Sequence, residues 1–189
     1  VSLSVTPGEA VYIPLAHDYL GAPTQLDKAS VLEALKPFLT SKEKVVIGQN
    51  LKYDYKIMAG EGMHLRAQLQ DTMLASYVLN PVSNSHSLDA MAENLLGVDT
   101  IHFEDIAGKG KKQLTFNQIS LETATPYAAE DADITFRLYK KFIKSLKSEK
   151  LFNIYEIFEK PLIKILAFME IEGVEVDSKF LNSLSSKFD

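Results

Sequence analysis

The chain has 189 residues, 46% of them hydrophobic, and a mean hydropathy of -0.03, which suits one globular domain or one domain plus a fragment. Because it has no cysteine, disulfides, thiolate metal sites and cysteine nucleophiles are excluded. The net charge of -5 argues against a stand-alone duplex-binding protein, and no apolar run approaches the length of a membrane span. We therefore expect a cytoplasmic monomer with no membrane partner.

The first half of the chain predicts strands that alternate with helices. A Thr6-Pro7-Gly8-Glu9 turn lies between two β-rich runs, which predicts a hairpin. Asp27 is placed to cap a helix over roughly residues 28–39. The further predicted elements are a strand over 45–47, a helix over 51–59, a strand around 65–69 and a helix that begins at Thr72 with Asp71 as its cap.

The second half of the chain is predominantly helical. A helix over 88–96 is expected to stop at Gly97, where a left-handed residue ends a helix readily. A long helix is expected over 123–148, in which Pro126 either begins the regular helix or kinks it. Another helix is expected from Leu151 to near Gly173. The alternation in the first half indicates an α/β fold.

Three side chains are candidates for chemistry. Tyr127 and Asp131 are four residues apart, so they share one face of the predicted long helix. Asp54 follows a predicted strand and lies in the first turn of the next helix, where the helix dipole favours a carboxylate. Taken singly, each has a structural alternative, namely a packed tyrosine beside an aspartate or a charge at a helix start. Together they suit phosphoryl transfer to water at hard cations.

The three candidates lie in two longer segments that resemble motifs of a known family. Residues 48–54 (GQNLKYD) resemble the second exonuclease motif, and residues 127–133 (YAAEDAD) resemble the third motif, of the bacterial DNA polymerase I family, the family A DNA polymerases. Residues 71–80 and 103–110 are similar to the sequence between those motifs, and residues 159–162 and 169–177 are similar to the opening of the polymerase domain. The resemblance covers essentially the whole chain.

The resemblance implies an α/β, RNase H-like exonuclease fold with a mixed central sheet flanked by helices, over residues 1–150. Residues 151–189 would begin the family A polymerase domain, as its first helical segment. The implied function is 3′-to-5′ proofreading in DNA replication and repair, which is hydrolysis of the 3′-terminal phosphodiester of single-stranded or mispaired DNA. Two divalent ions, Mg²⁺ or Mn²⁺, would be the cofactors, and the rest of the polymerase would be a partner in the same parent chain.

The family pattern assigns a role to each matching residue. Asp54 would hold or orient the second metal ion, Asp131 would bind the first, and Tyr127 would position the water that attacks. The resemblance also implies contacts to the terminal nucleotides of a single strand from Gln49, Asn50, Lys52 and Phe103, with Phe103 stacking on a base. The structural alternatives are a solvated Lys52 and a Phe103 that belongs to the core.

The sequence departs from the family pattern in two places. The first acidic motif of the family, Asp-x-Glu on a central strand, would lie upstream of Val1, so the fold is expected to be N-terminally truncated and this fragment inactive alone. Ser85 stands where the family has an arginine. Two alternatives stay open: a non-catalytic structural domain, which Asp54, Tyr127 and Asp131 argue against, and an RNase D-like exonuclease, which the polymerase-like tail after Glu159 argues against.

Overall fold

The computed structural model describes residues 1–188, whose strands form two separate two-stranded sheets. In the first, β1 (Ser2–Thr6) pairs antiparallel with β2 (Glu9–Tyr12), and Gly8 adopts a φ of 83° in the turn between them. In the second, β3 (Val45–Gly48) pairs parallel with β4 (Gln68–Asp71), so that Gly48 lies opposite Asp71. The predicted α/β class is confirmed, although the described strands form two short ladders rather than one continuous sheet.

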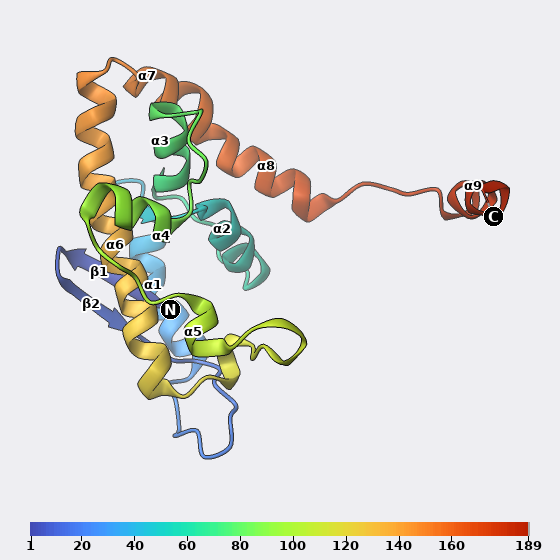
Figure 1. The fold of residues 1–189 in the computed structure, drawn as a ribbon, viewed down its shortest axis with the longest axis horizontal. Coiled ribbons are helices and arrows are strands. Elements are labelled where there is room, and N and C mark those ends of the chain that lie inside the picture. The colour runs from blue at the N-terminus through green and yellow to red at the C-terminus, as the bar shows by residue number, and fades with distance from the viewer. Residues whose placement is uncertain (189) are drawn as a thin grey trace.

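Helices make up most of the described chain (Figure 1). The helical elements are α1 (Lys28–Leu39), α2 (Leu51–Gly60), α3 (Thr72–Leu79), α4 (Leu88–Met91), the π-helical η1 (Ala92–Leu96), α5 (Phe103–Ala107), the 3₁₀ turns η2 (Gly110–Lys112) and η3 (Phe116–Gln118), α6 (Leu121–Ser148), α7 (Phe152–Ile154), the π-helical η4 (Tyr155–Glu159), α8 (Lys160–Glu172) and α9 (Ser178–Phe188). Within residues 1–188, none of these helices is both long and apolar enough to span a membrane.

The long helix α6 connects the two sheets. It packs against β1 and β2 of the hairpin and also against β3, and Figure 1 shows it running past the hairpin along the body of the molecule. Its apolar stripe contributes Ile134, Leu138, Phe142 and Leu146, each at most 4% exposed, to the main core. Because Tyr127 and Asp131 lie on this same helix, the core packing of α6 also sets their position.

Several predicted helix ends are confirmed. Asp27 accepts a hydrogen bond from the Ser30 N–H at the start of α1, and Gly97 ends η1 with a left-handed φ of 65°. The start of α6 differs from the prediction, because the Ser120 side chain caps the helix and accepts from the Thr123 N–H. Pro126 consequently lies inside α6 rather than at its first position, and α6 continues through it to Ser148.

The segment after α6 shares the core of the preceding elements. Tyr155 is fully buried among α3 and α6 side chains, and Ile163 is buried against α2 and β4. The last buried residue of α8 is Ala167, and α9 has no buried residue. Figure 1 shows α8 projecting from the body and α9 lying beyond it at the end of an extended segment. The first part of the expected second domain is therefore packed on the first.

Candidate active site

The candidate site begins where the parallel strands end, as open α/β sheets commonly arrange their sites. After β3 the chain turns sharply through Asn50, whose φ of 57° is in the left-handed region, and then enters α2. Asparagine tolerates this conformation better than most residues. A side chain on Gly48 would place its Cβ 2.6 Å from the Leu51 Cδ1, so the turn requires glycine there. The turn places Asp54 in the first turn of α2, as predicted.

A buried carboxylate holds this turn against the next strand. Asp71 Oδ2 accepts from the Leu51 N–H at 2.7 Å, which joins the end of β4 to the start of α2. Its Oδ1 accepts from the N–H groups of Met73 and Leu74 at 2.8 and 3.1 Å, and so caps α3 as predicted. The backbone of Asp71 is bound in turn by the Tyr155 hydroxyl, which accepts from its N–H at 2.7 Å.

Sequence reasoning identified Asp71 only as a helix cap. The available signal was its place directly after the strand that pairs with β3, because Gly48 and Asp71 are then neighbours at the same sheet edge. One carboxylate thus fixes the first turns of two helices, and one of these helices carries Asp54.

Asp54 lies at the surface of α2, yet its pKa is raised to about 6. Partial removal of water from around the carboxyl group is the main cause, and the charge of Asp71 adds to it. A backbone N–H that bonds the carboxylate acts in the opposite direction. Asp54 and Asp71 therefore form one acidic pair at the carboxyl end of the parallel strands.

Asp131 belongs to a second acidic group, on α6 and α4. Burial raises its pKa to about 7, and the charges of Asp89 and Glu130 raise it further. Tyr127, which lies one helical turn away on the same face of α6, favours the charged form of Asp131 and so opposes this rise in pKa. Burial and the charge of Asp131 in turn raise the pKa of Tyr127 to about 12, so Tyr127 remains a hydrogen-bond donor at neutral pH. Asp89 was not identified from the sequence, which offers no motif at that position.

Aromatic side chains surround Tyr127. Its ring centre lies 6.0 Å from that of Phe103 and 5.9 Å from that of Phe116, and both phenylalanines pack against a small core of α5 and α6 residues. Phe116 in turn contacts Tyr12 and the buried His17, which link the hairpin to this cluster. Phe103 is only partly buried, and its stacking on a base stays a prediction.

Of the remaining predicted contact residues, Gln49 and Lys52 have side-chain partners within the chain. The Gln49 side-chain amide donates to the His86 carbonyl at 2.8 Å and accepts from the Thr72 hydroxyl at 2.5 Å. The Lys52 ammonium is paired with Glu170 of α8. The Asn50 side chain is exposed and makes no capping bond.

Two other acids near Tyr127 are structural. Glu130 accepts from the Ile101 N–H at 2.8 Å and so holds the loop before α5. Asp133 accepts from the Gly8 N–H at 2.6 Å and fixes the hairpin turn against α6, with Arg137 as a second partner.

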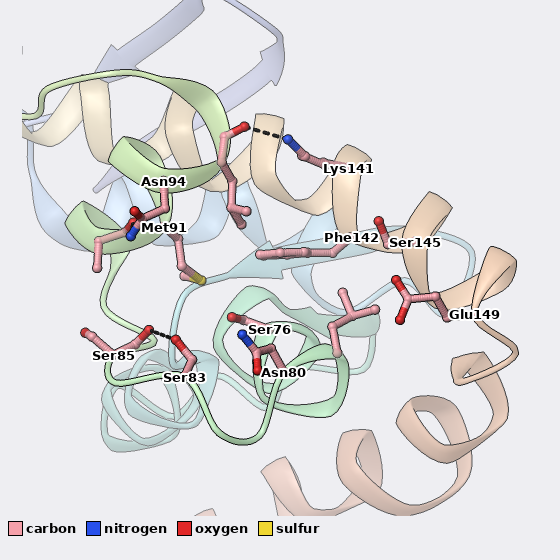
Figure 2. Close-up of a pocket in the computed structure, with 13 residues that line it drawn as sticks. Ser76, Asn80, Ser83, Ser85, Met91, Asn94, Lys141, Phe142, Ser145 and Glu149 are labelled. Carbon is pink, nitrogen blue, oxygen red and sulfur yellow. Dashed lines mark hydrogen bonds between the residues drawn. The ribbon is translucent and has the colours of Figure 1, made fainter.

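A serine-rich pocket is a separate feature. A pocket of about 360 Å³ lies between α3, η1 and α6, and Figure 2 shows Ser76, Asn80, Ser83, Ser85 and Asn94 around it. On its far side the Lys141 ammonium donates to the Leu95 carbonyl at 2.6 Å. Neither Asp54 nor Asp131 lines this pocket, so it is not the acidic site.

The raised pKa of Asp131 predicts a pH-dependent effect on stability. The Asp131 carboxyl has a pKa of about 7 in the folded chain and 3.8 in the unfolded chain. Between these two pH values the folded chain binds more protons than the unfolded chain, so the free energy of unfolding falls as the pH rises from about 4 to about 7. We expect Asp131→Asn to stabilise the fold by about 1 kcal/mol at pH 8, after allowance for solvent screening, and by almost nothing near pH 4. Urea unfolding with a metal chelator present measures the difference. An effect of equal size at both pH values would contradict this origin.

Fold and site together define a class: an α/β domain with acidic groups at the carboxyl end of its parallel strands and on its longest helix. Comparison with known families gives the particular member. The model of the family A DNA polymerase exonuclease domain, described as 3′-5′ exonuclease, matches residues 1–147. The chain belongs to this family.

Named relatives agree with the family. The chain is 48% identical over 184 residues to DNA polymerase I of Pseudomonas aeruginosa and 39% identical over 186 residues to that of Rhizobium leguminosarum. These alignments cover 96% and 94% of this chain but 20% and 18% of the relatives, so the chain spans about a fifth of their length.

Solved structures share the fold. A structure described as the POL domain of Pol1 from M. smegmatis, in complex with DNA primer-template and dNTP, superposes with a TM-score of 0.68 at 23% identity. It covers 86% of this chain and 26% of its own. Brucella melitensis NrnC superposes with a TM-score of 0.55 at 17% identity, over 78% of this chain and 64% of its own.

Proposed function

We propose that this chain is the proofreading part of a DNA polymerase I, which removes nucleotides one at a time from the 3′ end of single-stranded or mispaired DNA. The observation that carries the proposal is the position of Tyr127 one helical turn from Asp131, whose pKa is raised to about 7 by burial and by the charges of Asp89 and Glu130. Residues 1–150 would form the exonuclease domain, and residues 151–189 would lead into the polymerase domain. The parent protein would be a cytoplasmic monomer.

Different residues would have different roles in the hydrolysis. The Tyr127 hydroxyl stays protonated, so it donates to a carboxylate or to the oxygen of a water beside Asp131. A carboxyl whose pKa is about 7 exchanges a proton with water near neutral pH, which suits general-base assistance. Asn50 presents an exposed amide to the last nucleotides, and Phe103 offers a partly exposed ring for stacking that does not depend on base identity.

Asp54 and Asp131 fit the coordination of Mg²⁺ or Mn²⁺. Mg²⁺ usually keeps several waters and is held by one or two carboxylates together with substrate phosphates, so it does not need a cage of protein ligands. Within residues 1–188, no three acids or histidines come together as a ready-made cage. The pKa values of Asp54 and Asp131 are both raised because their negative charges are partly removed from water. A bound cation would stabilise these charges. Such an ion, when bound, neutralises phosphate charge and lowers the pKa of bound water.

Titration with Mn²⁺ tests this assignment. We expect calorimetry near neutral pH to show Mn²⁺ binding that Asp131→Asn weakens by about tenfold, because the amide replaces an anionic oxygen ligand with a neutral one. Glu122→Gln, an equal change of charge at an exposed position in the first turn of the same helix, is the matched control and should bind as the unmodified chain does. Equal affinity in the Asp131 and Glu122 variants would remove Asp131 from the site and favour a non-catalytic structural domain.

A further inference from the structure

Two lysines on α2 share one acidic partner on α8. Lys52 and Lys56 are four residues apart and therefore lie on the same face of α2. The Lys56 Nζ lies 2.8 Å from Glu170 Oε2, and the Lys52 Nζ is bound to Glu170 Oε1. Each carboxylate oxygen of Glu170 thus has its own ammonium partner, and the two lysines lower the pKa of Glu170.

This arrangement is the one in which a phosphodiester would be bound. A phosphodiester also presents two anionic oxygens from one centre, and lysine binds phosphate as a point charge without a strict angular requirement. Lys52 lies in the first turn of α2, two residues after Asn50, so a phosphate held here would belong to a strand that passes the turn at Asn50. We propose that Lys52 and Lys56 form a phosphate-binding pair for single-stranded DNA, which the Glu170 carboxylate occupies when no strand is bound. The inference rests on the proposed function.

The energetics allow such an exchange. All three side chains are between 32% and 40% exposed, and ion pairs of this exposure contribute little to stability. A strand can therefore displace Glu170 at small cost, and the release of counterions from its phosphates favours the exchange.

The position of Glu170 in α8 permits the movement. Ile163 and Ala167 anchor the first part of α8 in the core, whereas Phe168, Met169 and Ile171 around Glu170 are at least half exposed. The end of α8 that carries Glu170 is therefore the part that projects from the body (Figure 1). Displacement of one side chain there disturbs no buried contact.

Fluorescence anisotropy with a labelled oligothymidylate, in the presence of a chelator to prevent hydrolysis, tests the proposal. We expect Glu170→Gln to tighten binding about threefold to tenfold, because the two lysines lose their competitor. Glu172→Gln is the matched control: it makes the same change of charge on the same exposed helix end, and Glu172 does not contact the lysines. It should leave the affinity nearly unchanged.

A lysine variant identifies the site. In Lys52→Gln/Lys56→Gln the oligonucleotide should bind more weakly, the salt dependence should become shallower by about 1.4 in log–log slope, and Glu170→Gln should then have no effect. If Glu170→Gln and Glu172→Gln bind alike while the lysine variant binds weakly, the competitor role is wrong and the proposed function stands. If no variant binds the oligonucleotide, the phosphate-binding pair and the DNA-binding part of the proposed function are both wrong.

Discussion

Replacement of Asp131 by alanine is expected to reduce metal-dependent release of nucleoside monophosphates from single-stranded DNA by on the order of a thousandfold or more. The proper sample is the longer polymerase that we propose carries this domain. The loss follows from the position of Asp131, which shares a face of α6 with Tyr127 and whose pKa burial and neighbouring acids raise to about 7. Alanine would remove both the proposed metal ligand and the carboxylate beside Tyr127.

Two controls separate this loss from unfolding. Primer extension by the same preparation should continue at the unmodified rate, because Asp131 lies on α6 of the exonuclease domain. Glu122→Gln, near the start of the same helix, should retain full hydrolysis. Hydrolysis by the Asp131→Ala protein at the unmodified rate would show that the reaction does not use this group of acids.

The second large effect concerns stability. Asp71→Ala is expected to lower the free energy of unfolding of the chain by about 3 kcal/mol, as measured by urea denaturation. The carboxylate is 2% exposed and accepts from Leu51, Met73 and Leu74, so its removal leaves backbone donors at the starts of α2 and α3 without partners. Burial raises the pKa of Asp71, and these same donors oppose that shift.

Asp27→Ala provides the comparison for this effect. Asp27 caps α1 in an ordinary exposed position, and its carboxylate bonds only to Ser30, so its loss should cost clearly less than the loss of Asp71. The difference between the two variants measures what Asp71 adds by joining two helices. If both substitutions cost the same, Asp71 acts as a simple cap, and its bond to Leu51 does not stabilise the start of α2.

Much of the fold was predictable because local signals agree with the final packing. Asp27, Asp71 and Gly97 each end or begin a helix as predicted, since capping depends on residues within one turn. The start of α6 was missed because Ser120 is a cap with no apolar pattern before it, and Pro126 drew the expected boundary toward itself. The division of the strands into two sheets depends on long-range pairing, which periodicity does not report.

The candidate site was predictable only in part for the same reason. Tyr127 and Asp131 share a helix face, so their proximity follows from spacing alone. The charge of Asp89 raises the pKa of Asp131, and the charge of Asp71 raises the pKa of Asp54. Asp71 also accepts a hydrogen bond from Leu51. Each of these interactions joins elements that are distant in sequence. The pairing of Lys52 with Glu170 likewise crosses from α2 to α8, and no motif on either helix indicates it.

The direction of digestion tests the central proposal most directly. A single-stranded oligonucleotide labelled at its 5′ end is incubated with the longer polymerase, with and without Mg²⁺. We expect a ladder of labelled products that lose one nucleotide at a time from the 3′ end, only with Mg²⁺ and not with Asp131→Ala. An oligonucleotide that stays intact with Mg²⁺, or that is cut internally, would contradict the assignment of this domain as an active 3′-to-5′ exonuclease.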